Sequence, residues 1–364
     1  MDLQQTCVEN NQRLAPHLAE ISRGEMIDAL EPFAKAYLGL YYQLDNSVPP
    51  RQRVASLANG ELSAAIMQGM QSLLLGASVP SAREIGEAYL LGQGLGVGYV
   101  LLAAVEEYCV EDAGAVLQLD ARVIAALLCY QFLHTSYQPL PWHERLLQQP
   151  PQTVIQVLEQ FWAPLQLAGR DFLPGLQTLI RGPRYAQLAT SLAIPLLEQW
   201  PQGDIYSVRR LMQWGLASED SEPLLSLAEQ RVAELPVAEI RRKVYWLVTA
   251  FIIEPRGHTE ELSHYIGRTK EKVLPLLDYV VALLRDPGIE RRLTAMDLAR
   301  LLRIIAPVFA RNQGRGGLLD DNSTRVLWLF EQLAAYPEGE RGLAVKWLSA
   351  VRVMRSYADI LDSL

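Results

Sequence analysis

The segment from Leu235 to Pro255 reads LPVAEIRRKVYWLVTAFIIEP, and its apolar positions decide the fold class. They recur with the spacing i, i+3, i+4 and i+7, which is typical of an α-helix that buries one face. These apolar residues are Val237, Ile240, Val244, Leu247, Val248, Phe251 and Ile252. Pro236 fits the first turn of such a helix, and Pro255 is expected to end it.

A second helical run begins at Thr269 and is broken by Asp286-Pro287-Gly288. Its apolar residues have the same spacing: Val273, Leu276, Leu277, Val280, Val281 and Leu284. The two runs predict a helix pair, and each helix must pack against neighbours to bury its apolar face.

The remainder of the 364-residue chain follows the same pattern, without a convincing alternating strand. Ser81 and Glu84 have the spacing of a capping box at a helix start. Proline-containing breaks recur at short intervals, as expected for stacked helix pairs of about 40 residues. The sequence therefore predicts an all-α protein, and more specifically an α-solenoid of degenerate HEAT-like helical hairpins. We expect helices at about 25–44, 51–59, 61–75, 82–91, 95–108, 120–134, 152–167, 171–180, 184–199, 204–217, 220–233, 236–254, 259–266, 269–285, 293–310, 321–336 and 338–359.

Two proline-rich connectors suggest where the chain divides. They are the run from Tyr137 to Trp142 and the pair Pro150-Pro151. We expect an N-terminal helical subdomain over residues 1–138 and a helical-repeat array over residues 139–364, with one continuous solenoid as the alternative.

Composition restricts the class of partner and the compartment. Half of the residues are hydrophobic, which is enough for a large core without disulfides. The formal net charge is −8, which disfavours nucleic acid as the main partner. Cys7, Cys109 and Cys129 lack the spacing of a zinc site or a disulfide framework and are expected to be small core residues in a reducing compartment. Charged residues precede any apolar run at the N-terminus, so we expect no secretory signal and a cytoplasmic location. The uncharged stretch 88–105 approaches the length of a membrane span, but its glycines and flanking glutamates favour a buried helix.

Motifs of catalysis are not recognised in the sequence. The glycine-rich stretch 92–98 has no preceding strand and no following Lys-Ser or Lys-Thr, so close helix packing explains it better than phosphate binding. His143-Glu144 resembles the start of a zinc-protease helix, but Leu147 stands where the second histidine is required. His258 and His264 are expected to be surface histidines among carboxylates such as Glu260 and Glu261. We therefore predict no enzyme activity, no metal site and no cofactor.

Arginines and tryptophans are the side chains of interest for binding. The arginines that cluster near the C-terminal end are Arg285, Arg291, Arg292, Arg300, Arg303, Arg311 and Arg315, against only Asp286, Glu290 and Asp297. They form either a solvated helix face or a patch for an anion or an acidic partner, with the Arg311–Gly317 loop as its mobile edge. Core packing accounts for most of the tryptophans, which are Trp142, Trp162, Trp200, Trp214, Trp246, Trp328 and Trp347.

The order of several stretches resembles the C-terminal helical-repeat region of bacterial NACHT-type STAND NTPases. The stretches are 33–40, 79–85, 140–142 with Pro150, 193–197, 242–247 and 320–333 with Pro337. In that family the repeat region follows an ATPase core and is regarded as a sensing and autoinhibitory arm, often in antiphage defence. This chain lacks the ATPase core and the effector domain, so the resemblance implies a recognition or scaffold role and supplies no catalytic residue. The resemblance agrees with a free-standing repeat protein, with one part of a larger system and with a piece of a longer protein.

The leading interpretation is a non-enzymatic helical-repeat scaffold that binds a macromolecular partner on its concave face and does not enter a membrane. A protein is the expected partner. The alternative is a HEAT-like nucleic-acid-binding or repair enzyme that uses the arginines between Arg285 and Arg315 for phosphate. A helical enzyme whose pocket forms only in three dimensions is a third hypothesis.

Overall fold

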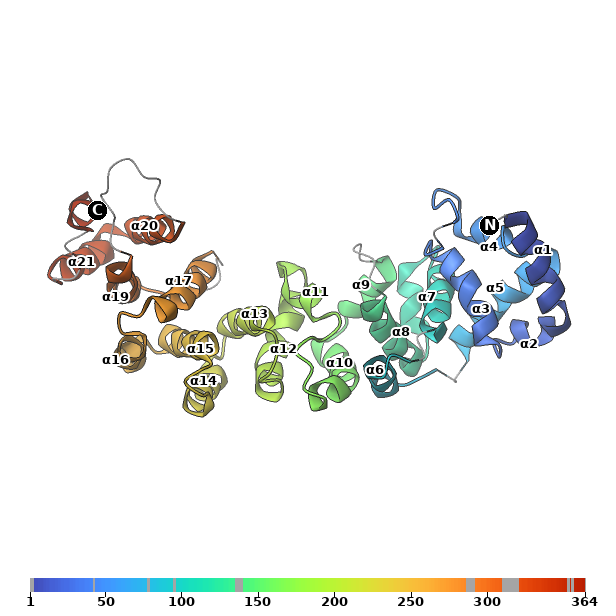
Figure 1. Cartoon of the computed structure of the whole chain (residues 1–364), viewed down its shortest axis with the longest axis horizontal. Helices are drawn as coiled ribbons and strands as arrows, with labels where there is room; N and C mark the ends of the chain where they lie inside the picture. Colours follow the sequence, from blue (N-terminus) through green and yellow to red (C-terminus); the bar gives the residue numbers. More distant parts are fainter. Residues whose placement is uncertain are drawn as a thin grey trace. The chain divides into compact units, whose positions relative to one another are not determined.

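The computed structural model describes residues 3–41, 43–76, 79–93, 96–134, 140–285, 292–309, 321–351, 354 and 357–363. These residues form helices and turns and contain no strand, so the predicted all-α class is confirmed. The chain divides into two compact units, Met1–Ser191 and Leu192–Leu364. Figure 1 shows the helices that make up each unit.

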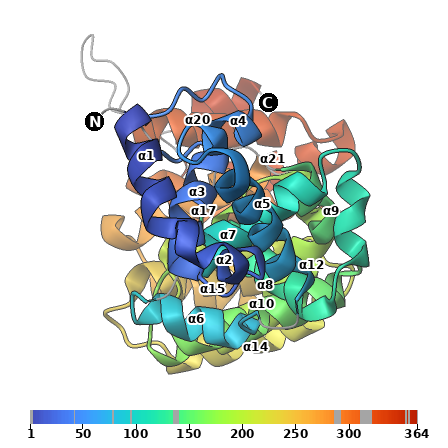
Figure 2. The same ribbon diagram turned by 90° about the vertical axis from the view of Figure 1, so that its right-hand side faces the viewer.

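In the first unit, helices distant in sequence pack in pairs. Its elements are α1 (Leu3–Leu14), η1 (Ala15–His17), α2 (Leu18–Ser22), α3 (Ile27–Tyr37), α4 (Pro50–Ala55), α5 (Gly60–Leu75), α6 (Ala82–Leu90), α7 (Gly96–Tyr108), η2 (Ala113–Gln118), α8 (Ala121–Leu133), α9 (Pro141–Leu147), α10 (Pro151–Leu167), α11 (Leu176–Ile180) and η3 (Pro183–Tyr185). Helix α7 packs against both α3 and α5, and α6 packs along α10 (Figures 1 and 2). Helix α12 (Ala186–Gln199) crosses the boundary between the units.

In the second unit, α15 is the central helix. The elements after α12 are α13 (Ile205–Leu216), α14 (Glu222–Glu234), α15 (Ile240–Ile253), α16 (Pro255–Ile266), α17 (Lys270–Leu284), α19 (Ala295–Ile305), η4 (Ala306–Val308), α20 (Asp321–Ala334), α21 (Glu338–Ser349) and α22 (Ala358–Ser363). Helices α13, α14, α16 and α17 all pack against α15. Helix α19 in turn contacts α16, α17, α20 and α21, so it links α16 to the C-terminal helices.

The apolar faces predicted for α15 and α17 are largely buried, as the periodicity requires. In α15 every predicted apolar position from Val244 onward is buried, and in α17 all six predicted positions are buried. Val237 is a correction, because its side chain is 74% exposed. The cause is a turn, in which the Glu239 N–H donates to the Pro236 carbonyl at 3.0 Å, so that the helix begins only at Ile240. Helix α15 ends just before Pro255, as expected. Pro255 also occupies the first turn of α16, where a backbone N–H would have no partner within the helix.

Several helices end earlier than the sequence predicted. Helix α3 ends at Tyr37 and not near residue 44, because Gly39 adopts a left-handed conformation with φ of 74°. The Leu40 N–H then donates to the Lys35 carbonyl at 2.8 Å, which closes the helix end. The capping box of Ser81 and Glu84 at the start of α6 is confirmed.

The division between the units differs from the seam expected at residues 138 and 139. The contacts divide the chain between Ser191 and Leu192. Helices on both sides of the expected seam belong to the first unit, since α9 packs on α8 and α10 packs on α6. Pro141 occupies the first turn of α9 and Pro151 the first turn of α10, so these prolines begin helices that pack within one unit. The solenoid arrangement itself stays a prediction.

Buried small residues occur largely where the sequence suggested. Cys109 and Cys129 are buried, whereas Cys7 is half-buried. Gly98 of α7 is buried against the ring of Tyr130 in α8, and a Cβ atom at this position would lie 2.4 Å from that ring. Close packing therefore accounts for this glycine. Among the described residues, no helix has the length and apolar character needed to cross a membrane.

Candidate binding groove between α16, α19 and α21

Three helices of the second unit surround an open groove with a volume of about 710 Å³. This volume lies within the range of ligand-binding pockets, which is roughly 300–1,000 Å³. The groove is lined by Thr259, Glu260, Glu261, Ser263 and His264 of α16, by Arg300, Arg303 and Ile304 of α19, and by Trp347 of α21. We call these residues the α16–α19–α21 groove.

The wall formed by α16 is acidic. Glu260 and Glu261 are both exposed and follow one another near the middle of the helix. Glu261 also contacts the buried His258, whose Nδ1 lies 3.3 Å from Glu261 Oε2. Leu262 and Ile266 are buried positions of α16, whereas Glu260 and Glu261 lie on its exposed side. The helix therefore presents two carboxylates to the groove.

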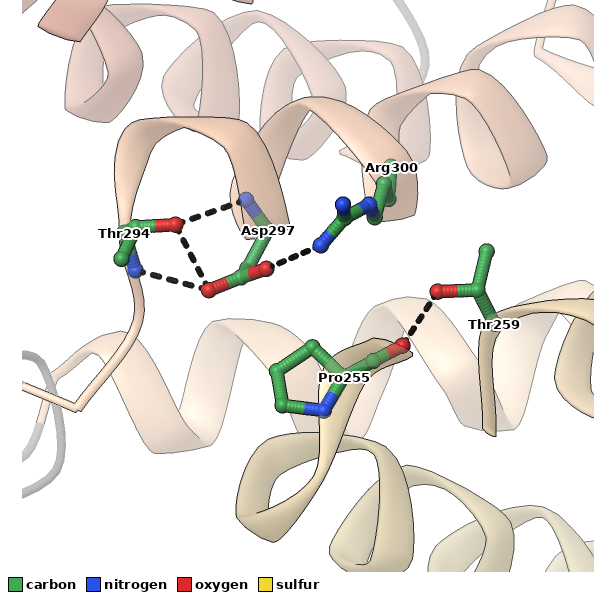
Figure 3. A network of polar contacts seen from close by, with 5 residues as sticks. All are labelled: Pro255, Thr259, Thr294, Asp297 and Arg300. Atoms are coloured by element: carbon green, nitrogen blue, oxygen red, sulfur yellow. Dashed lines mark hydrogen bonds and ion pairs between the residues drawn. The ribbon is translucent and has the colours of Figure 1, made fainter. Parts of the chain in front are cut away.

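The opposite wall is basic, and one of its two arginines is held in place by a buried carboxylate. Arg300 Nη1 donates to Asp297 Oδ1 at 2.6 Å. The other oxygen of Asp297, Oδ2, accepts from the backbone N–H of Thr294 at 3.1 Å and from its hydroxyl at 2.6 Å. Figure 3 shows these contacts at the start of α19, close to Pro255 and Thr259 of α16. Thr294 and Asp297 thus form a capping box that also orients Arg300.

The second arginine lies against an aromatic ring. The guanidinium carbon of Arg303 is 5.4 Å from the centroid of the Trp347 ring. Arg303 is exposed and Trp347 is half-buried. Within the described part of the chain, no carboxylate forms an ion pair with Arg303. Its charge is therefore available to a ligand, while the stacking restricts the side chain.

Removing the carboxylate of Asp297 tests whether α19 depends on this network. We expect Asp297→Ala to lower the free energy of unfolding by about 2 kcal/mol, because it removes the cap and leaves Arg300 without its partner. Urea denaturation followed by circular dichroism would measure the loss. Glu338→Ala, an exposed acidic position in the first turn of α21, is the matched control and should change stability by less than about 0.5 kcal/mol. Equal losses in the two variants would contradict a supporting role for Asp297.

Four of the seven arginines in the predicted patch lie in the described residues, and only two of them share the groove. Arg300 and Arg303 line it. Arg285 lies over the ring of Trp328 at 5.6 Å, and Arg292 donates to the backbone carbonyl of Ser218. The remaining three, Arg291, Arg311 and Arg315, are outside the described residues, as is the Arg311–Gly317 loop.

Sequence reasoning missed the other side chains of the groove. It assigned Glu260, Glu261, His258 and His264 to a solvated surface and most tryptophans to the core. His258 is a correction, because its side chain is buried. Trp142, Trp162, Trp200 and Trp246 are indeed buried, but Trp347 lies at the groove. Nothing in the local pattern of α21 distinguishes Trp347 from a core residue, because the groove is formed by three helices that are separate in sequence.

A second group of ionisable side chains lies in the first unit, where α3, α4 and α7 meet. Burial raises the pKa of Glu106 to about 7. Its neighbour Glu107 accepts from the Tyr37 hydroxyl at 2.8 Å and from Arg51 Nε at 2.8 Å. These hydrogen bonds satisfy Glu107 within the protein, and Glu106 does not line any of the described cavities. We therefore regard this group as part of the helix packing.

The groove can recognise charged groups of both signs. Across residues 3–363, with the undescribed gaps left aside, no group of three or more His, Cys, Asp or Glu side chains is arranged to hold a metal ion. Carboxylates on one wall and guanidinium groups on the other can form ion pairs with a ligand that carries both charges. A half-buried tryptophan beside them supplies apolar contact area.

Comparison with known proteins does not assign this chain to a family. The resemblance to the repeat region of NACHT-type STAND NTPases therefore stays a prediction. No protein-family model, curated protein or solved structure matches the chain.

Proposed function

We propose that this protein is a helical-repeat recognition module that binds a segment of a protein partner in the α16–α19–α21 groove. The observation that carries the proposal is a groove of about 710 Å³ with acidic residues on one wall, arginines on the other and a half-buried tryptophan beside them. Exposed Trp and Arg side chains are the residue types that contribute most to binding at protein interfaces. In this proposal the chain acts by recognition and not by catalysis.

The charges of the groove favour a protein segment over a nucleic acid. Glu260 and Glu261 would repel phosphates that approach Arg300 and Arg303. Asp297 already neutralises Arg300 at 2.6 Å. The net charge of −8 also opposes the approach of a polyanion. A nucleic-acid-binding function would require a run of arginines without carboxylates beside them.

The resemblance to the repeat region of NACHT-type STAND NTPases supports a sensing role for this recognition. We propose that the helices form a HEAT-like solenoid and that the groove is the sensing surface of a larger cytoplasmic antiphage system. Binding of the sensed segment would then be the signal passed to an ATPase.

Peptide selection tests the proposed function. Random twelve-residue peptides displayed on phage would be selected on the purified full chain, and the recovered peptides labelled and titrated by fluorescence polarisation. We expect Trp347→Ala to weaken their binding about tenfold or more, since loss of a central aromatic side chain typically costs about 2 kcal/mol.

Trp328→Ala is the matched control, because Trp328 is also half-buried beneath an arginine but does not line the groove. Recovered peptides that bind both variants and the unmodified chain equally well would contradict the proposal. Retention of a single-stranded DNA that is lost in Arg303→Glu would favour the nucleic-acid function.

A further inference from the structure

Two charges in the α16–α19–α21 groove lack a strong partner within the described residues. They are Arg303, which only stacks on Trp347, and Glu260, which forms no ion pair among the described side chains. The other lining charges are partly compensated, since Arg300 pairs with Asp297 and Glu261 contacts His258. Binding should therefore depend mainly on Arg303 and Glu260, one from each wall.

The two walls exclude ligands of a single sign. A purely acidic segment would meet Glu260 and Glu261 on α16, and a purely basic segment would meet Arg300 and Arg303 on α19. Like charges placed together across an interface are strongly unfavourable, and opposite charges determine orientation. The apolar lining residues are Ile304, which lies on α19 with Arg300 and Arg303 and is 7% exposed, and Trp347 of α21. This arrangement suits an apolar or aliphatic stem between two charged ends.

We propose that the groove recognises a short amphoteric protein segment, with a carboxylate side chain paired to Arg303 and a lysine or arginine paired to Glu260 and Glu261. An apolar portion of the segment packs against Ile304 and Trp347. The opposite charges of the walls also fix its direction, because reversing the segment would place each charged end against a wall of the same sign. This inference rests on the proposed function and specifies its partner.

Charge exchange between protein and peptide is the test. The probes are peptides selected on the full chain, each remade with its acidic residues changed to lysine or its basic residues changed to glutamate. On the unmodified chain we expect each exchange to weaken binding about tenfold. On Arg303→Glu the acid-to-lysine peptide should bind more tightly than its parent. On the double variant Glu260→Lys, Glu261→Lys the base-to-glutamate peptide should do so.

Matched variants separate these effects from loss of structure. Arg285→Glu reverses an arginine that stacks on a tryptophan outside the groove, and Glu271→Lys reverses an exposed glutamate on α17. Both should leave peptide binding within about twofold of the unmodified chain. Arg303→Gln removes the charge without reversing it and should give an intermediate loss if Arg303→Glu proves unstable.

Each other outcome overturns the inference in a distinguishable way. If peptides require Trp347 but are of one sign, or if the exchanges leave affinity unchanged, the proposed function stands and the amphoteric partner is wrong. If no recovered peptide depends on the groove, both fail. If twelve-residue oligothymidine competes with the peptides and binds less well to Arg303→Gln, the ligand is a nucleic acid.

Discussion

Gly86→Ala is expected to lower the free energy of unfolding of the first unit by about 3 kcal/mol. Gly86 is buried in α6, and a Cβ atom there would lie 2.2 Å from the Phe161 carbonyl oxygen of α10. That oxygen belongs to the backbone of a long helix, so it cannot rotate away as a side chain would. The two helices must separate, and contacts along their interface are lost. The gain of about 1 kcal/mol that alanine usually brings to a helix is too small to compensate.

Urea denaturation monitored by circular dichroism measures this loss. The matched control is Glu87→Ala, which changes the next residue of the same helix at an exposed position whose only ion-pair partner among the described residues is Arg83 on the surface. A surface ion pair of this kind contributes little, so the control should stay within about 0.5 kcal/mol of the unmodified chain. If Gly86→Ala is as stable as the control, then α6 and α10 do not approach as closely as described.

Acidification is expected to destabilise the first unit through His143. This residue of α9 is 4% exposed, and its ring packs edge-on against Phe132 at 5.1 Å between centroids. Its Nε2 atom is buried and has no hydrogen-bond partner among the described residues. Burial lowers the pKa of His143 to about 4 from its ordinary value of 6.5.

The direction of the effect follows from proton binding. Between pH 6.5 and pH 4 the unfolded chain protonates this histidine while the folded chain does not, so stability falls as the pH is lowered. Over that interval the protonation of His143 is expected to lower the free energy of unfolding by about 3 kcal/mol. Above pH 6.5 the contribution of His143 to the free energy of unfolding is constant.

His143→Phe should abolish this part of the pH dependence, because phenylalanine keeps a buried ring but does not titrate. The free energy of unfolding of both proteins would be measured at intervals from pH 8 to pH 4. Below pH 6.5 the free energy of unfolding of the variant should increase progressively relative to that of the unmodified chain. Phe161→Leu, a non-titrating core substitution in the same unit, should show a constant difference across the range. A constant difference for His143→Phe as well would show that the folded protein and the unfolded chain protonate His143 over the same pH range.

The helical class and much of the local structure could be predicted from the sequence. The apolar periodicity of α15 and α17, the capping box of Ser81 and Glu84, and the helix boundary at Pro255 all depend on residues within about four positions of one another. Interactions over that distance are encoded in the order of the residues. The errors also have local causes, since Gly39 ends α3 and a turn after Pro236 exposes Val237.

The set of residues that line the groove depends on the tertiary structure and could not be predicted from the sequence. The sequence selected Arg300 and Arg303 as part of a single basic patch, but packing of α19 against α16 and α21 placed Glu260, Glu261 and Trp347 around them. The same packing left Arg285 and Arg292 outside the groove. The periodicity of a helix indicates which face is buried, but it does not indicate which other helix that face meets. The charge of the site therefore became mixed through contacts between residues that are far apart in the chain.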